Sequence, residues 1–221
     1  MRGSRIVPFG DAALLVELDV VGAVEAAREA RALAATIGAR RAGEPAIGIP
    51  VPAASSVLVP FDPLTLDPRL VTELIAGVIS TTVAMHPPEV ADGTLHRILV
   101  HYGGEHGPDL DPVAAELGLS TADVIDLHAG AELEVLFLGF APGFAYLGEL
   151  PPGLRVPRLS TPRVRVPAGS VAIAGTMSAV YPHASPGGWR ILGRTDAAMW
   201  DPFATPPARL RPGDRVRFVP A

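Results

Sequence analysis

The stretch FLGFAPGFAYLGELPP (137–152) decides the fold of the second half of this chain. Short apolar runs alternate there with Pro-Gly corners, and the same texture returns in SPGGWRILGRT (185–195). Short strands with turns at intervals of about eight to twelve residues predict a β-barrel or a sandwich. The corners also carry aromatic residues, which turns alone do not need, so both stretches are candidates for a binding surface.

The first half differs, because long helical patterns separate its short strands. Residues 20–38 and 67–84 carry apolar residues at helical spacing, and Gly38 is expected to end the first helix. Strands are predicted over 5–18, 45–52, 55–61 and 95–102. The order β-α-β-β-α-β is typical of a split-βαβ, or ferredoxin-like, domain. Two shorter helices, 111–118 and 121–129, follow, and either Ser120 or Thr121 can cap the second.

These patterns predict an α+β protein of two domains, residues 1–90 and 91–221. The absence of Cys excludes disulfides and Cys-ligated metals. All 18 cationic residues are Arg, so the chain offers neither a lysine Schiff base nor a P-loop lysine, and ATP would need a phosphate cradle from another chain. A formal net charge of −5 argues against nucleic-acid binding. The start lacks a signal-peptide core and the apolar runs are short, which predicts a cytoplasmic protein without membrane contact.

Titratable residues gather in HYGGEHGPDL (101–110). His101 and His106 are not at a standard metal-ligand spacing, so we predict no metal site. The favoured interpretation is a loop in which Asp109 or Asp111 caps the following helix, while a role toward a substrate stays open for Glu105 or Asp109. Lone histidines elsewhere, such as His128, are expected to be structural.

The aromatic residues and the arginines each allow two interpretations. Phe140, Phe144 and Tyr146 either plug the barrel core or wall a small pocket beside the Pro142-Gly143 turn. Arg163 and Arg165 share one face of a strand, where they either protect a sheet edge or form a fork for a carboxylate or phosphate. The Gly187-Gly188 pair before Trp189 also allows two interpretations. Either it lets the backbone approach a ligand closely, or it belongs to a hairpin in which Trp189 serves only as a lid over the core.

Four stretches in this order resemble the family of the 5-oxoprolinase B subunit, also called KipI-like or allophanate hydrolase subunit 1: HYGGEHGPDL, LGFAPGFAYLGELP, TPRVRVPAGSVAIAG and YPHASPGGWRILGRT. FGDAALLVEL (9–18) and SSVLVPFDP (55–63) extend the resemblance over nearly the whole chain. The resemblance implies an N-terminal α/β domain and a C-terminal cyclophilin-like β-barrel.

The resemblance also implies a function. The chain would be the B subunit of an ATP-dependent 5-oxoprolinase, inactive alone, which hydrolyses 5-oxo-L-proline to L-glutamate with a KipA-like C subunit (allophanate hydrolase subunit 2 type) and a LamB/YcsF-like A subunit. ATP, with Mg²⁺, would act in the complex, and this chain alone would bind no cofactor. The alternative is a KipI-like regulator that binds and inhibits a sensor histidine kinase.

Site residues follow position by position from the family's motifs. From residue type and proximity in sequence, we expect catalytic roles for Arg163, Arg194 and Tyr181 at these matched positions, with both guanidinium groups holding a carboxylate or phosphoryl group. The resemblance implies substrate contacts for Phe144, Tyr146, Ser170, Gly187, Gly188, Trp189 and Thr195. One departure is Met177, where the family usually has Gln. A thioether replaces a carboxamide there, which implies either a changed ligand or a position that tolerates the change.

Overall fold

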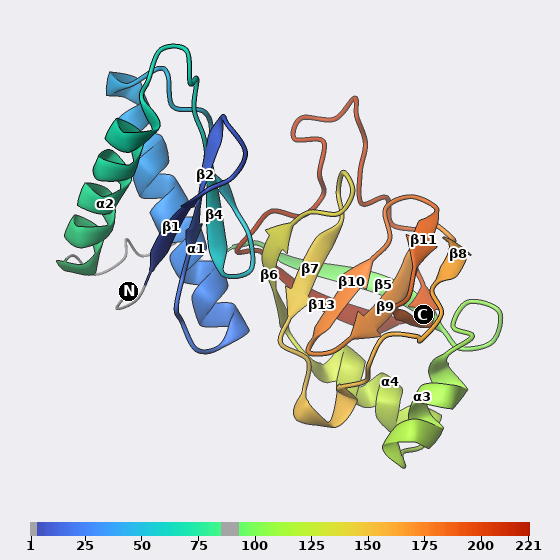
Figure 1. The fold of residues 1–221 in the computed structure, drawn as a ribbon. Helices are drawn as coiled ribbons and strands as arrows, with labels where there is room; N and C mark the ends of the chain where they lie inside the picture. Colours follow the sequence, from blue (N-terminus) through green and yellow to red (C-terminus); the bar gives the residue numbers. More distant parts are fainter. Residues whose placement is uncertain (1–3, 85–92) are drawn as a thin grey trace. The chain divides into compact units, whose positions relative to one another are not determined.

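The structure, a computed structural model, describes residues 4–84 and 93–221 (Figure 1). The chain divides into two compact units, Met1–Ala91 and Asp92–Ala221. The predicted mixture of helices and strands with a β-barrel is confirmed. The predicted boundary between residues 90 and 91 lies outside the described residues. No helix in the described part of the chain is long and apolar enough to span a membrane.

The first unit is a four-stranded antiparallel sheet with two helices. Its elements are β1 (Arg5–Pro8), β2 (Ala13–Glu17), α1 (Ala23–Arg40), a 3-10 turn (Arg41–Gly43), β3 (Val51–Pro52), β4 (Ser56–Pro60) and α2 (Pro68–Ala84). The strand order is β1-β2-β4-β3. Alternate residues of β2 and β4, such as Leu14, Val16 and Val57, are buried against the helices, as the period of two requires.

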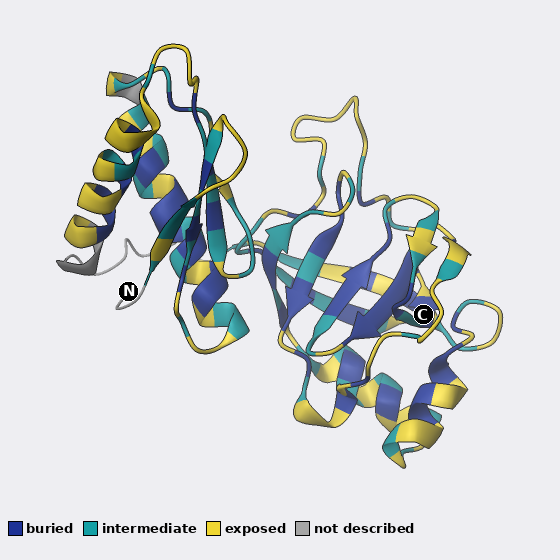
Figure 2. Cartoon of the chain, viewed as in Figure 1, coloured by how far each residue is buried: buried dark blue, intermediate teal, exposed yellow. Residues whose placement is uncertain are grey.

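The helix α1 is rich in Ala, so its backbone can pack closely on the sheet. Its buried stripe is visible in Figure 2 and includes Ala30, Leu33 and Ile37. The prediction that Gly38 ends this helix is wrong, because α1 continues to Arg40. Glycine is compatible with helical backbone, and the complete burial of Ile37 next to it holds the last turn on the sheet.

The ferredoxin-like pattern is not confirmed. It required residues 95–102 as the closing strand of the first unit, but this segment is β5 (Leu95–Tyr102) and belongs to the barrel. There β5 pairs in parallel with β13 over its first six residues. The edge of the first sheet beside β2 is instead occupied by β1. Apolar alternation identified β5 as a strand but could not show which sheet it joins.

The second unit is a closed seven-stranded barrel in the order β10-β7-β6-β13-β5-β12-β9. Its remaining elements are α3 (Leu110–Leu117), α4 (Thr121–Gly130), β6 (Leu133–Leu138), β7 (Ala145–Gly148), a 3-10 turn (Pro152–Leu154), β8 (Arg163–Val166), β9 (Ser170–Ala174), β10 (Met177–Val180), β11 (Ser185–Gly187), β12 (Arg190–Arg194) and β13 (Arg215–Pro220). The predicted cap of α4 is confirmed, since Ser120 and Asp123 form a reciprocal capping box.

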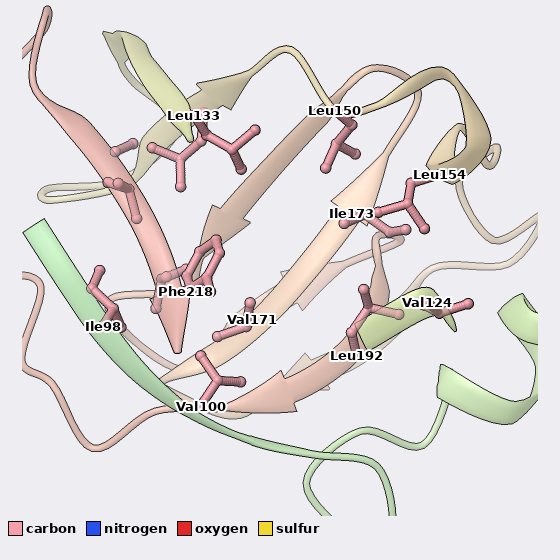
Figure 3. Packing of buried hydrophobic residues seen from close by; sticks show 14 of the residues in the cluster. Ile98, Val100, Val124, Leu133, Leu150, Leu154, Val171, Ile173, Leu192 and Phe218 are labelled. Atoms are coloured by element: carbon pink, nitrogen blue, oxygen red, sulfur yellow. The ribbon is translucent and has the colours of Figure 1, made fainter. Parts of the chain in front are cut away.

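Inward-facing aliphatic side chains fill the barrel (Figure 3). Val100, Val171 and Leu192 come from three adjacent strands, and Phe218 comes from β13. The helices α3 and α4 pack on the barrel through β12 and β13, respectively. The strands β8 and β11 do not belong to the barrel and form a separate two-stranded ribbon.

Candidate functional site

Six aromatic rings form one connected group, which we call the aromatic cluster: Phe137, Phe140, Phe144, Tyr146, Tyr181 and Trp189. Phe144 is its centre, because its ring lies 5.0 Å from Tyr146, 5.3 Å from Tyr181 and 5.9 Å from Trp189, centroid to centroid. All three contacts are edge-to-face, a favoured aromatic geometry. Half of the chain's seven Phe, three Tyr and two Trp therefore meet in one place.

The aromatic cluster belongs to a hydrophobic core separate from the barrel interior. Phe144, Tyr181 and Trp189 are buried with Ala172 and Ala174 of β9 and with Val166 of the β8–β11 ribbon. The rings are therefore not plugs of the main barrel core, which was one of the two alternatives that the sequence left open. Tyr146 is half-buried and Phe140 is 65% exposed, so these two form the solvent-facing rim of the cluster.

Phe140 lies in a strained turn. Its φ of 68° falls in the left-handed region, and no other non-glycine among the described residues has a positive φ. The Ala141 N–H donates to the Gly139 carbonyl at 2.8 Å, which closes a three-residue turn around Phe140. Beside it, Gly143 has a φ of 78°, and a Cβ there would lie 2.7 Å from the Trp200 Cβ. The predicted Pro-Gly corner is thus held by close packing.

Arg163 and Asp109 form a largely buried ion pair at the edge of this core. The Arg163 Nη2 lies 2.7 Å from the Asp109 Oδ1, and their side chains are 29% and 7% exposed. The other carboxylate oxygen of Asp109 accepts the Ile191 N–H at 2.7 Å. Asp109 stands at the N-cap of α3, yet it makes no capping hydrogen bond, so the predicted capping role is wrong for its side chain. The Arg163 guanidinium and the Ile191 amide use both oxygens instead.

Sequence reasoning missed Arg158, which lies over the aromatic cluster. Its guanidinium carbon is 5.8 Å from the centre of the Trp189 ring, within the range of a cation–π contact. The flanking backbone is fixed on both sides, since Arg190 Nε donates to the Pro157 carbonyl at 3.2 Å and the Leu159 N–H donates to the Gly188 carbonyl at 2.7 Å. The one available signal was the repeated Pro-Arg pair, at 157–158 and 162–163.

The hydroxyl of Tyr181 faces backbone and positive charge. Burial raises the pKa of Tyr181 above its ordinary value, against smaller lowering effects from a hydrogen bond with the Trp189 backbone and from Arg158 and Arg163. Burial likewise raises the pKa of Tyr146, again opposed by Arg158. Both phenols are therefore protonated at neutral pH and are available as hydrogen-bond donors rather than as bases.

The glycine pair expected to approach a ligand divides into two different environments. A side chain at Gly187 would overlap the Tyr181 hydroxyl, so glycine is required there. At Gly188 the atom nearest to an added Cβ would be the Leu159 carbonyl oxygen at 3.6 Å, which is an ordinary contact. Gly187 also pairs with Arg163 in the β8–β11 ribbon.

The other predicted site residues gather around the Gly169 turn. Arg194 pairs with Ser170 across β12 and β9, and the Thr195 N–H donates to the Gly169 carbonyl at 2.9 Å. Ser170 and Thr195 are buried, whereas the Arg194 side chain is exposed. The Tyr181 N–H donates to the Ser170 carbonyl, and this hydrogen bond connects the Gly169 turn to the aromatic cluster.

Met177 packs, partly buried, against the aromatic cluster. The thioether that replaces the Gln usual in the family therefore faces the core that contains the aromatic cluster. In residues 4–84 and 93–221, no three His, Asp or Glu side chains gather in an arrangement that could hold a metal ion.

His128 is buried in a complete hydrogen-bond chain inside the barrel, as expected for a structural histidine. Its Nδ1 lies 2.7 Å from the Tyr102 hydroxyl and its Nε2 lies 3.0 Å from the Ser178 Oγ. Ser178 donates to the Ala172 carbonyl, so Nε2 must carry the hydrogen and Nδ1 must accept from Tyr102. Burial lowers the pKa of His128 to about 3, which keeps the ring neutral.

The fold and this site define a class of protein: a closed barrel with an aromatic core on its outer side, preceded by an α/β unit. Residues 4–210 match the family of the carboxyltransferase domain, subdomain C and D. The chain belongs to this family. It is 46% identical over 170 residues to the B subunit of 5-oxoprolinase from Escherichia coli O157:H7, an alignment that covers 68% of this chain and 78% of that protein.

Solved structures of longer proteins contain the same fold. The protein TTHA0988 superposes with a TM-score of 0.79 at 38% identity, over 95% of this chain and 40% of the other. The Kluyveromyces lactis urea carboxylase superposes with a TM-score of 0.80 at 20% identity, over 99% of this chain and 22% of the other, and shows the fold alone. The chain thus spans less than half of each of these two proteins.

Proposed function

We propose that this chain is the B subunit of an ATP-dependent 5-oxoprolinase complex, which hydrolyses 5-oxo-L-proline to L-glutamate together with C-type and A-type subunits. The observation that carries this proposal is the aromatic cluster with its adjoining arginines, in a family whose E. coli relative is named as the B subunit of 5-oxoprolinase. A flat five-membered lactam with one carboxylate needs an apolar wall and a cation, which the aromatic cluster and the adjoining arginines would supply.

The residues of this chain would bind and orient the lactam. Tyr181, protonated at neutral pH, would donate a hydrogen bond, and Phe144 and Trp189 would exclude water from one side of the ring. Arg163 is already paired with Asp109, so its role would be to position the Tyr181 region rather than to hold a charged group by itself. Arg194, exposed beside Gly169, would face a second ligand or a partner chain.

ATP would be held mainly by another protein of the complex. The chain contains no Lys, so it lacks the residue that a P-loop uses on the phosphates. When bound in the complex, ATP would supply activation of the lactam carbonyl by phosphoryl transfer. We assign no step of that transfer to a residue of this chain.

The test is reconstitution of the chain with its candidate partner subunits and measurement of ATP-dependent glutamate release from 5-oxo-L-proline. We expect release only when all subunits are present. No release from any combination, together with inhibition of a sensor histidine kinase by the chain alone, would replace this proposal by the regulatory alternative.

A further inference from the structure

We propose that Arg158, rather than the paired Arg163, is the residue of this chain that binds a carboxylate, with the half-buried Tyr146 ring beside Trp189 as the surface for an apolar, planar ligand body. The inference takes its substrate from the proposed function and names the anchor for it. It rests on the charge balance, the clamped backbone and the aromatic surroundings of Arg158.

The charge balance separates Arg158 from Arg163 and Arg190. Arg163 is neutralised by Asp109 at 2.7 Å, and Arg190 is neutralised by Glu116 at 2.7 Å. Within residues 4–84 and 93–221, no ion pair or side-chain hydrogen bond involves Arg158, whose side chain is exposed. The guanidinium can therefore offer its full donor fork to an anion from solution.

The backbone around Arg158 is ordered in advance. Arg190 holds the Pro157 carbonyl and also reaches Glu116 of α3, while Leu159 is tied to Gly188. The bonds on both sides fix the chain at the residue that carries the cation. Less conformational entropy is then lost when a ligand binds, which favours affinity.

The surroundings select the class of ligand. Trp189 lies 5.8 Å below the guanidinium carbon, and the Tyr146 ring lies 5.8 Å from Trp189. Arg158 also acts electrostatically on both Tyr146 and Tyr181, so both phenols lie within range of its charge. One free cation above the aromatic cluster, with the half-buried Tyr146 phenol as a donor, fits a small monocarboxylate with a flat apolar body. A polyanion would require a second free cation at the same place.

The matched control for Arg158 is Arg165, an exposed arginine on β8 for which the described residues show no cation–π contact with Trp189 and no electrostatic effect on Tyr146 or Tyr181. The full chain, in a Trp200→Phe background, carries Trp189 as its only indole and reports binding by fluorescence. Each variant is titrated with three compounds: 5-oxo-L-proline, the uncharged carboxamide of 5-oxo-L-proline, and benzoate. The titrations are made with the chain alone and with the chain in the reconstituted complex. Thermal unfolding of each variant verifies that it is folded.

We expect Arg158→Gln to weaken 5-oxo-L-proline binding by roughly 10- to 100-fold, which corresponds to the loss of one charge-assisted interaction. Arg158→Lys should recover part of the affinity, and Arg165→Gln should bind like the parent chain. Equal binding by Arg158→Gln and the parent, equal binding of the carboxamide, or no carboxylate binding by the parent would overturn the inference. Benzoate binding that depends on Arg158, without glutamate release from the complex, would sustain the inference and remove the proposed function.

Discussion

Replacement of Arg163 by Ala tests whether this arginine is first of all a structural partner of Asp109. The Asp109 side chain is 7% exposed, so the change would leave a nearly buried carboxylate without its counter-ion. Breaking a buried pair costs about 3–5 kcal/mol. The lower end applies here, because Arg163 is 29% exposed and Asp109 keeps its bond from the Ile191 amide. We expect a loss of about 3 kcal/mol in the free energy of unfolding.

Tryptophan fluorescence during urea denaturation is the suitable assay, because Trp189 and Trp200, the only two tryptophans, both lie in the unit 92–221. The thermal midpoint of that unit should fall by about 12 °C, at about 4 °C per kcal/mol. Adding Asp109→Asn should make the double variant more stable than the sum of the two single effects predicts, by about 1–2 kcal/mol. A loss below about 1 kcal/mol in Arg163→Ala, or strictly additive effects, would refute the reasoning.

Three further changes have defined outcomes. His128 has a folded-state pKa of about 3, below its unfolded value of about 6.5. Its contribution to the free energy of unfolding is therefore complete above about pH 6.5 and is lost as the pH falls toward 3. In His128→Gln, the free energy of unfolding should depend less steeply on pH over this range. Gly187→Ala should cost about 1–3 kcal/mol and displace the tyrosine beneath it, whereas Gly188→Ala should be tolerated, as seen by chemical denaturation and tyrosine NMR signals. Phe144→Ala should cost about 3–5 kcal/mol, but Phe140→Gly should change the midpoint of urea unfolding little, because relief of strain offsets the lost ring contact.

Much of the fold was predictable because local patterns agreed with tertiary burial. The helix α2 begins at Pro68, one residue after the predicted start at 67, and Ser120 is one of the two residues that could cap α4. Prediction failed where a non-local partner decides. The helix α1 passes through Gly38 because Ile37 is buried, and β5 pairs with β13 rather than with the first sheet.

The candidate site was predictable in its aromatic residues but not in its charges. Phe144, Tyr181 and Trp189 do meet, and all three were among the site residues expected from the resemblance. Which arginine stays free depends on where the carboxylates lie, and the pairing of Arg163 with Asp109 spans 54 residues. Sequence spacing carries no information about such a pairing, so Arg158 could be recognised only from the structure.

The parallel pairing of β5 with β13 has a consequence for how the protein is made. The Thr94 amide and the Asp214 carboxylate that flank this pairing are 120 residues apart, so the ribosome must deliver nearly the whole second unit before the barrel can close. Until β13 arrives, β5 and β6, the strands on either side of it, present unpaired edges to other nascent chains. During the time that the ribosome needs to synthesise the second unit, these strand edges are open to pairing with other chains. Newly made chains thus depend on chaperones or on rapid collapse to keep the edges apart.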